Sequence, residues 1–416
     1  MSSNWQATTL GQICEKQGGA IQTGPFGSQL HTSDYKEFGV PVVMPTNIGD
    51  GGIVEDGIAR IDQADVERLS QHKLRLGDIV FSRRGDVTKN ALIRAHEVGW
   101  FCGTGCLKVR LGHESIANAK FISHCLRLPD IKDWLIRHAV GATMPNLNTG
   151  ILSAVPIHLP PLQTQLEIAV MLGSLDDRIA LLRETNATLE GIAQALFKSW
   201  FVDFDPVRAR MDGRAPEGMD EATAALFPDG LEESELGLVP RGWRVARLDD
   251  FLELAYGKAL KAIDRTPGDV PVYGSGGVTG SHNESLVNGP SVIIGRKGTV
   301  GSLYWEDQPF FPIDTVFYIR TSIPMTYCFY LLQTLGLTGM NTDAAVPGLN
   351  RSNVYRLTVP FASETVLKAF DDVVCLIRER IFCNHQQAQT LAALRDTLLP
   401  RLISGQLRLP DVEESA

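Results

Sequence analysis

Two pairs of basic residues, each followed by a glycine, are the clearest chemistry-bearing features of the chain. They are Arg83-Arg84-Gly85 and Arg296-Lys297-Gly298. Arginine hydrogen-bonds guanine through two donors, whereas lysine and backbone N–H groups hold phosphates. Glycine lets the backbone approach a ligand closely. Because the two pairs occupy corresponding places in the two halves of the chain, we predict that both contact DNA.

Other basic, amide and hydroxyl side chains lie in similar glycine-containing segments, where loops carry function. Asparagine and glutamine suit adenine, which adds amides to the candidates. The full set of candidate DNA-binding residues is Gln22, Arg83, Arg84, Lys89, Asn90, Lys258, Lys261, Arg265, Tyr273, Ser275, His282, Asn283, Arg296 and Lys297. For any single one of them, the alternative is a solvated side chain that touches no DNA.

Motifs for intrinsic catalysis are missing from the sequence. It contains no Asp-Pro-Pro-Tyr or Asn-Pro-Pro-Phe run of amino-methyltransferases, no G-x-x-x-x-G-K-[ST] phosphate loop and no H-E-x-x-H. The seven cysteines form no C-x-x-C pair, and the scattered histidines lack metal-ligand spacing. The glycine-rich run 295–301 follows a strand-like segment without a helix pattern after it, which favours a turn beside DNA over a phosphate cradle. We therefore predict no catalytic residue, metal or cofactor in this chain.

The net charge of −9 argues against nucleic-acid binding only until it is located. The segment 203–239 carries ten acids against three arginines, a net −7, and the tail from Arg408 carries three acids against one base, a net −2. The rest of the chain is therefore neutral, and local basic clusters decide nucleic-acid affinity. No signal-peptide pattern or long apolar run is present, which predicts a cytoplasmic protein without a membrane segment.

The 416 residues predict two to three domains, and the chain repeats itself. A shift of 202 residues places Pro145, Leu147 and Asn148 on Pro347, Leu349 and Asn350. The first variable domain (1–159) and the second (240–361) alternate with long conserved segments at 160–203 and 362–405. An acidic linker (204–239) and a tail (406–416) complete the chain. Short apolar runs at 79–81, 106–109, 291–294 and 316–319 predict strands, and 119–138 and 325–337 predict helices, so each variable domain is mixed α/β.

Each long conserved segment shows apolar or small residues at alternating steps of four and three, the pattern of a heptad seam. The first seam runs through Ile168, Leu172, Leu175, Ile179, Leu182, Asn186, Leu189, Ala193, Leu196 and Trp200. The second runs through Phe370, Val374, Ile377, Ile381, Asn384, Ala388, Leu391, Arg395, Leu398 and Leu402. We expect two helices of about 40 residues, each roughly 60 Å long at 1.5 Å per residue.

A long helix with one apolar stripe needs a partner, and the repeat supplies it. Because a domain separates the two helices along the chain, we predict an antiparallel pairing in which Asn186 faces Asn384, so that each buried amide satisfies the other. The alternative is that one or both asparagines face water. The predicted fold is α+β: two mixed α/β domains separated by an antiparallel two-helix coiled coil with pseudo-twofold symmetry, which matches the symmetry of DNA half-sites.

Several motifs of this chain resemble one known family. They are Leu159-Pro160-Pro161-Leu162-Gln163-Thr164-Gln165, the run from Ala195 to Val207 at the end of the first helix, and the run from Leu398 to Leu407. These runs resemble the conserved regions of the specificity subunit of type I restriction–modification systems, which are host-defence enzymes. Gly24-Pro25-Phe26-Gly27-Ser28 and Val272-Tyr273-Gly274-Ser275 resemble the openings of that family's target recognition domains. The run from Phe361 to Thr365 departs from the pattern at the second helix.

The resemblance implies a non-catalytic subunit that reads an asymmetric, bipartite site in double-stranded DNA. It also implies assembly with two modification subunits, which bind S-adenosylmethionine and methylate adenine, and with restriction subunits that use ATP and Mg²⁺. Two other readings stay open: a S-adenosylmethionine-dependent DNA methyltransferase with unrecognised motifs, and a coiled-coil scaffold without a DNA role.

In this family the long helices carry the modification subunits, and several apolar residues near the helix ends are candidates for that contact. The candidates for the subunit interface are Phe197, Trp200, Phe201, Leu394, Leu399 and Ile403. Their alternative role is packing against the chain's own recognition domains.

Overall fold

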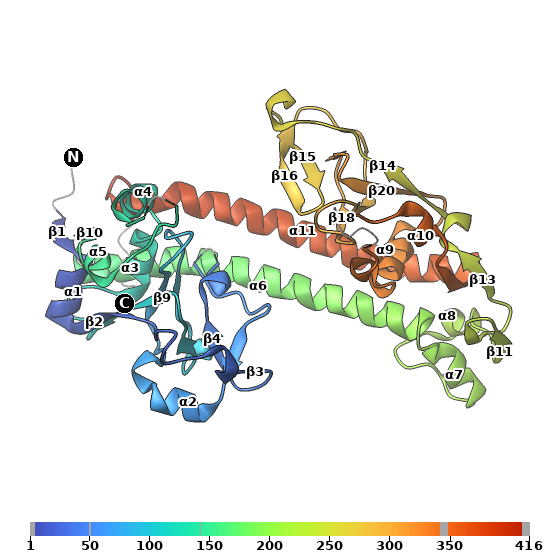
Figure 1. The fold of residues 1–416 in the computed structure, drawn as a ribbon, viewed down its shortest axis with the longest axis horizontal. Helices are drawn as coiled ribbons and strands as arrows, with labels where there is room; N and C mark the ends of the chain where they lie inside the picture. The colour runs from blue at the N-terminus through green and yellow to red at the C-terminus, as the bar shows by residue number, and fades with distance from the viewer. Residues whose placement is uncertain (1–4, 50, 142, 342–347, 410–416) are drawn as a thin grey trace, which may run out of the picture. The chain divides into compact units, whose positions relative to one another are not determined.

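The computed structural model describes residues 5–49, 51–141, 143–341 and 348–409. The chain divides into two units: unit 1 comprises Met1–Leu181 and Ala388–Ala416, and unit 2 comprises Leu182–Gln387. Two 40-residue helices, α6 (Leu162–Phe201) and α11 (Glu364–Ile403), run through both parts of this division (Figure 1). Each unit therefore holds one stretch of α6, one stretch of α11 and one mixed α/β domain.

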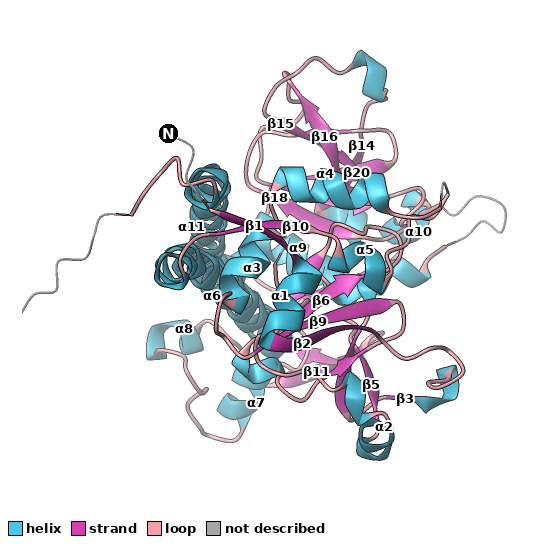
Figure 2. Cartoon of the chain, turned by 90° about the vertical axis from the view of Figure 1, so that its left-hand side faces the viewer, coloured by secondary structure: helices cyan, strands magenta, loops and turns pink. Residues whose placement is uncertain are grey.

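Unit 1 has three small sheets, with strand orders β1-β10, β2-β9-β6-β7 and β3-β5-β4-β8. The strand β10 directly precedes the start of α6 along the chain and pairs with β1, the first strand of the chain (Figure 2). The elements before α6 are β1 (Gln6–Thr9), α1 (Leu10–Gln17), β2 (Gly18–Thr23), β3 (Tyr35–Lys36), β4 (Val40–Val43), β5 (Ala59–Ile61), α2 (Gln63–Arg68), β6 (Ile79–Ser82), β7 (Asn90–Leu92), β8 (Phe101–Cys102), β9 (Cys106–Gly112), α3 (Ala119–Cys125), α4 (Pro129–His138), α5 (Thr149–Ser153) and β10 (Pro156–Leu159).

Unit 2 has sheets of strand order β13-β21, β14-β20-β17-β18 and β16-β15-β19, and a separate hairpin β11-β12. Its elements between α6 and α11 are α7 (Asp205–Met211), α8 (Glu221–Ala225), β11 (Leu231–Ser234), β12 (Gly237–Pro240), β13 (Arg244–Arg247), β14 (Leu252–Tyr256), β15 (Val270–Gly274), β16 (Gly277–His282), β17 (Ser291–Gly295), β18 (Leu303–Glu306), β19 (Phe311–Pro312), β20 (Val316–Thr321), α9 (Met325–Thr334), α10 (Arg351–Tyr355) and β21 (Thr358–Phe361).

The two units repeat one topology. In each, the first and last strands pair antiparallel, as β1 with β10 and β13 with β21. The sheets β2-β9-β6-β7 and β14-β20-β17-β18 both place their strands in the order first, fourth, second, third along the chain. A short parallel pairing also recurs, with Val42 opposite Phe101 and Val272 opposite Phe311. The internal repeat seen in the sequence is thus a repeat of strand connections.

The two predicted helices form with the expected length. Every predicted seam residue of α6 and α11 is buried or half-buried. In unit 2 the side chain of Asn384 donates a hydrogen bond to Oδ1 of Asn186 at 2.8 Å, and Asn186 donates to the carbonyl of Ile381. The predicted asparagine pair is confirmed. Further along the same helix stretches, Arg378 pairs with Glu190 at 2.9 Å, so the numbering runs in opposite directions and the pairing is an antiparallel coiled coil.

Unit 1 anchors the start of α6 through one buried amide. Gln165 is fully buried, its Nε2 group donates to the carbonyls of Ile116 and Pro160, and its Oε1 accepts from the N–H of Asn118. In unit 2 the residue 202 positions later is Leu367, which is buried among apolar side chains. The departure from the sequence motif at the second helix therefore replaces a polar anchor by an apolar one.

Two expectations need correction. The stretch 119–138 is not one helix but α3 and α4, because Pro129 begins a new helix and holds Leu128 in an extended conformation (ψ 141°). The acidic segment 204–239 is not a plain solvated linker either. It folds into α7, α8 and the β11-β12 hairpin, and Val207 and Phe227 pack into the core of unit 2 while its acids stay at the surface.

Among the described helices, none combines the length and apolar character required to cross a lipid bilayer.

Candidate nucleic-acid interface

The two basic pairs occupy the same place in the repeated topology. Arg83 follows β6 and Arg296 follows β17, the third strands across the sheets β2-β9-β6-β7 and β14-β20-β17-β18. The carbonyl of Arg83 accepts from the N–H of Leu147 at 2.9 Å, and the carbonyl of Arg296 accepts from the N–H of Leu349 at 2.8 Å. The structure therefore joins each basic pair to the segment that recurs with a 202-residue shift.

That recurring segment has a local reason to repeat. Asn148 caps α5 by accepting from the N–H of Ile151 at 2.8 Å, and Asn350 caps α10 by accepting from the N–H of Ser352 at 2.9 Å. Asparagine is among the strongest N-cap residues because its side chain satisfies a helix N–H that would otherwise lack a partner. Each cap fixes the turn against which the basic pair rests.

In unit 1, Arg83 is half-buried and Arg84 is exposed. The Nε of Arg83 donates to Oδ1 of Asn146 at 3.2 Å, and its guanidinium lies 6.0 Å from the ring centre of Phe26. Phe26 is 56% exposed.

In unit 2, Arg296 is half-buried and Lys297 is exposed. The Nε and Nη2 of Arg296 both donate to the carbonyl of Asp314, and the guanidinium lies 5.3 Å from the ring centre of Tyr256. Arg351, the first residue of α10, lies over the same ring at 5.1 Å. Tyr256 is 51% exposed.

Most other candidate residues are accessible. Arg265 and Ser275 are half-buried, and Arg265 donates to the carbonyl of Thr279 at 2.7 Å. Lys89 lies at a cavity of about 330 Å³ together with Lys132 and Arg127. The exposed candidates are Gln22, Arg84, Lys89, Lys258, Lys261, Asn283 and Lys297.

Three candidates do not have the accessibility that base contact needs. Asn90 is 2% exposed, and its side chain donates to the carbonyl of Thr88. Tyr273 is 7% exposed; its hydroxyl donates to Glu306, and burial together with that carboxylate raises its pKa. His282 is 8% exposed, with Nδ1 accepting from the N–H of Thr266. These side chains shape their own domains, so we remove them from the set of DNA contacts.

The predicted subunit interface also changes. Phe197, Trp200 and Phe201 are at most 6% exposed in the core of unit 2, where Phe197 packs on Phe370 with ring centres 5.8 Å apart. Leu399 and Ile403 are buried in the core of unit 1. The alternative role, packing on the chain's own domain, holds for these five. Leu394 alone among the six is exposed, at 46%.

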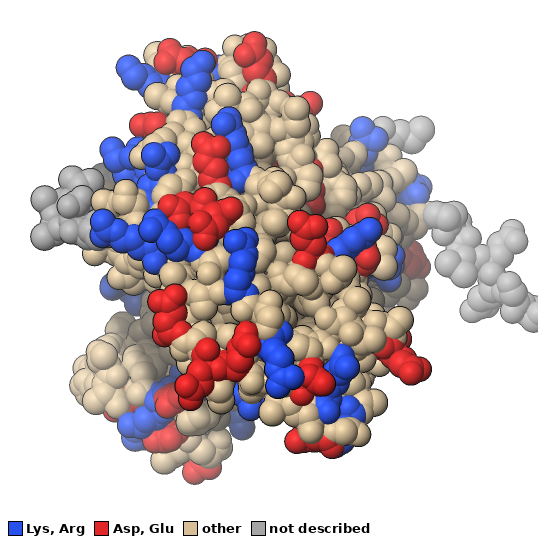
Figure 3. Space-filling model, turned by 90° about the vertical axis from the view of Figure 1, so that its right-hand side faces the viewer, with Lys and Arg blue, Asp and Glu red and all other residues tan. Residues whose placement is uncertain are grey.

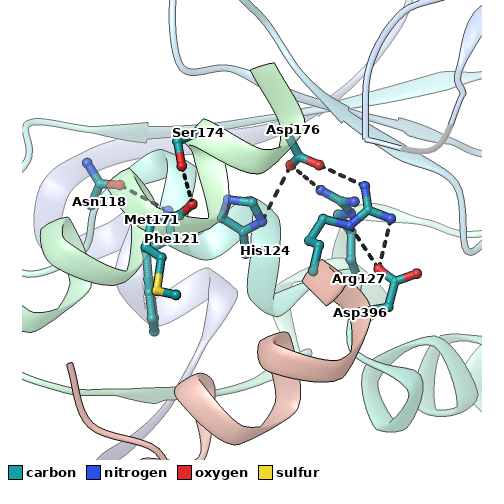
Figure 4. Close-up of polar contacts among 9 residues, drawn as sticks. Asn118, Phe121, His124, Arg127, Met171, Ser174, Asp176 and Asp396 are labelled. Carbon is teal, nitrogen blue, oxygen red and sulfur yellow. Dashed lines mark hydrogen bonds and ion pairs between the residues drawn. The ribbon is translucent and has the colours of Figure 1, made fainter. Parts of the chain in front are cut away.

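An ion-pair network that the sequence did not reveal joins three elements of unit 1 (Figure 4). Asp176 of α6 accepts from Arg127 and from Arg395 of α11, both at 2.7 Å. Burial acts to raise the pKa of Asp176, but the two guanidinium groups outweigh it and hold that pKa below its usual range. His124 of α3 lies 3.9 Å from the same carboxylate, and burial lowers its pKa to about 4.

The described residues show no metal-ligand cluster, and one face of the molecule carries charges of both signs. Within the described ranges, no group of three or more His, Cys, Asp or Glu side chains gathers as metal ligands would. On the face that Figure 3 presents, lysine and arginine side chains are interspersed with aspartate and glutamate.

Comparison with known proteins identifies relatives over most of the chain. The family described as Type I restriction modification DNA specificity domain matches residues 2–191 and 240–362. The HindI specificity subunit of a type I restriction enzyme from Haemophilus influenzae is 27% identical over 341 residues, which cover 66% of this chain and 73% of that protein. The MjaIX specificity subunit from Methanocaldococcus jannaschii is 24% identical over 322 residues, which cover 71% of this chain and 70% of that protein.

A solved structure has a similar fold. The S subunit of a type I restriction-modification system from M. genitalium aligns with 98% of this chain and 97% of its own, with a TM-score of 0.53 and 19% sequence identity.

Proposed function

The chain belongs to the family of type I restriction modification DNA specificity domains, and we propose that it reads a bipartite, asymmetric site in double-stranded DNA. Specificity subunits of this family are recognition components and do not catalyse the reaction themselves. Each unit of this chain would read one half-site. Because the two units share a topology but differ in sequence, the two half-sites differ too.

One observation carries this proposal: the same strand connection presents a basic pair in both units. Arg83-Arg84 and Arg296-Lys297 follow equivalent strands, and the same backbone hydrogen bond to Leu147 or Leu349 holds each pair. A single-chain protein with two equivalent readers suits DNA, whose half-sites also come in pairs. We expect the gap between half-sites to be about half to one helical turn.

We further propose that the chain assembles with two modification subunits and with restriction subunits. The methyl donor S-adenosylmethionine would then bind to the modification subunits, and ATP and Mg²⁺ to the restriction subunits. Exposed apolar residues on α6 and α11 support such contacts, since soluble surfaces rarely gather them without a partner. In unit 1 they are Val170, Leu181 and Leu394, and in unit 2 they are Ile192, Val373 and Leu376.

The test is to map methylated adenines across the genome of cells that contain the modification subunits, with and without this chain. We expect a bipartite, asymmetric motif that appears only when the chain is present. Methylation that is unchanged by removal of the chain would contradict the proposal, as would a continuous motif without a gap.

A further inference from the structure

The arginine of each basic pair lies over an exposed aromatic ring. In unit 2 the guanidinium of Arg296 is 5.3 Å from the ring centre of Tyr256, and in unit 1 that of Arg83 is 6.0 Å from the ring centre of Phe26. Both distances fall within the range of cation–π attraction. The two rings are 51% and 56% exposed, so the chain itself covers neither of them fully.

Each arginine is also anchored on one edge of its guanidinium. Arg296 donates from Nε and Nη2 to the carbonyl of Asp314, and Arg83 donates from Nε to Oδ1 of Asn146. A guanidinium carries five N–H groups in a planar fork. The Nε side of each guanidinium is thus held by the protein and a ring lies beside it, whereas Nη1 of either arginine has no hydrogen-bond partner among the described residues and can donate to a ligand.

A guanidinium held in this way suits the recognition of a base. Guanine presents O6 and N7 as adjacent acceptors in the major groove, and a bidentate arginine must bring two N–H groups to them in one plane. A flexible arginine loses side-chain entropy when it adopts that plane, whereas an arginine already held flat loses less. An arginine that is anchored beside a ring should therefore lose less side-chain entropy when it binds guanine.

Resting on the proposed function, we propose that Phe26 and Tyr256 are specificity-determining positioning residues, each of which orients one arginine for reading a guanine. Arg83 reads the guanine of the half-site bound by unit 1, and Arg296 that of the half-site bound by unit 2. The neighbouring exposed residues, Arg84 and Lys297, hold the adjacent phosphates.

Unit 2 has one additional cation at this place. Arg351 lies 5.1 Å from the ring centre of Tyr256 and is the first residue after the Asn350 cap. The residue after the matching cap in unit 1 is Thr149, which carries no charge. Arg351 is therefore an additional DNA contact of unit 2, and the two half-sites differ in how strongly they depend on salt.

The test maps the methylation motif directed by the full chain together with its modification subunits, for Tyr256→Ala, Tyr256→Phe, Phe26→Ala and Arg296→Ala. Loss of a bidentate arginine lowers discrimination at one base pair by about 5- to 150-fold. We expect Arg296→Ala and Tyr256→Ala to relax one guanine of the same half-site, and Phe26→Ala to relax one guanine of the other. Tyr256→Phe keeps the ring and should stay within about twofold of the wild type.

A matched control comes from a second arginine–tyrosine stack in unit 2. Arg320 lies 5.2 Å from the ring centre of Tyr318, and the carboxylate of Glu253 lies 3.8 Å from its guanidinium. Arg320→Ala should leave the motif unchanged. Thermal unfolding of every variant shows whether the fold is intact, which is expected because the substituted rings are half exposed.

The outcomes separate this inference from the proposed function. A wild-type chain that directs no bipartite motif contradicts the proposed function. If the motif exists and Arg296→Ala relaxes a guanine but Tyr256→Ala does not, the ring does not orient the arginine and the inference is wrong. It is also wrong if no guanine of either half-site depends on Arg83 or Arg296.

Discussion

The amide groups of Asn384 and Asn186 meet inside the helix pair of unit 2, with a donor–acceptor distance of 2.8 Å. Asn384 is 2% exposed, and Asn186 uses its own N–H group on the carbonyl of Ile381. A polar pair at a seam position costs stability compared with leucine but fixes the register of the two helices. This pair therefore sets which turn of α6 meets which turn of α11.

Replacement of one asparagine should be more harmful than replacement of both. Asn384→Leu leaves Oδ1 of the half-buried Asn186 without its donor, at an expected cost of about 1–3 kcal/mol in the free energy of unfolding. The double variant Asn186→Leu/Asn384→Leu should recover much of this loss. Chemical unfolding of the four proteins of this double-mutant cycle gives the coupling, and additive effects would contradict the pairing.

Asp176 should be essential for the stability of unit 1. Asp176→Ala leaves Arg127, whose side chain is 6% exposed, without this counter-ion, and it removes one of the two acids that pair with the buried Arg395, the other being Asp396 at 2.8 Å. Loss of one partner of a buried pair typically costs about 3–5 kcal/mol. The adjacent and exposed Asp177 is the matched control, and Asp177→Ala should change the free energy of unfolding by less than about 0.5 kcal/mol.

Unit 1 should lose stability in mild acid because of His124. Its pKa of about 4 in the folded chain lies below the ordinary 6.5, so the unfolded chain takes up the proton first. As the pH falls from 6.5 towards 4, the free energy of unfolding should therefore fall, by up to about 3 kcal/mol. Asp176, Arg127, Arg395 and Lys120 are the charged groups that act on this histidine.

The variant His124→Gln should flatten the pH dependence in this window without adding a titrating group. Unfolding curves at pH 7, 6, 5 and about 4.5 measure the effect. Identical slopes for wild type and variant would show that His124 is not the group that titrates.

The aromatic residues at the end of α6 should behave as core and Leu394 as surface. Phe197→Ala removes a ring that is 2% exposed and should cost about 3–5 kcal/mol. Leu394→Asp, at a position 46% exposed, should leave unfolding unchanged while weakening co-purification of modification subunits. Normal subunit binding by Leu394→Asp would remove this last residue from the predicted interface.

Charge reversal of either basic pair should weaken DNA binding and its salt dependence. Each phosphate that the protein no longer neutralises makes the slope of log affinity against log salt shallower by about 0.9. Arg83→Glu/Arg84→Glu and Arg296→Glu/Lys297→Glu should both show this in titrations of the assembled complex at several salt concentrations. Arg214→Glu is the control, because Arg214 is 67% exposed but pairs with Asp212 in the acidic segment.

Helix periodicity was sufficient to predict the long helices and their register. Seam positions recur over about 40 residues in each helix, and an asparagine interrupts each seam, so few registers satisfy both the apolar spacing and the pairing of the two amides. The break at Pro129 was missed because the apolar spacing continues across it, although proline restricts the preceding residue.

Side-chain direction was beyond the reach of the sequence. Tyr273 and His282 lie on β15 and β16, where one step along a strand turns a side chain from solvent to core. The Asp176 network was missed for a different reason, since Arg127, Asp176 and Arg395 are far apart in the chain. Phe26 and Tyr256 did leave a signal in the sequence, because each of them adjoins a glycine. Phe26 lies in the segment that follows β2, and Tyr256 is the last residue of β14; β2 and β14 are each the first strand of a four-stranded sheet.

In both units α6 supplies the carboxylate and α11 the guanidinium: Asp176 with Arg395 in unit 1 and Glu190 with Arg378 in unit 2. Two α6 helices from separate copies would lack both of these interhelical ion pairs, and so would two α11 helices. At these contacts α6 is therefore acidic and α11 is basic. This charge pattern favours pairing of α6 with α11 of the same chain over pairing of identical helices from separate copies. The preference matters during synthesis, when many unfinished copies are present together.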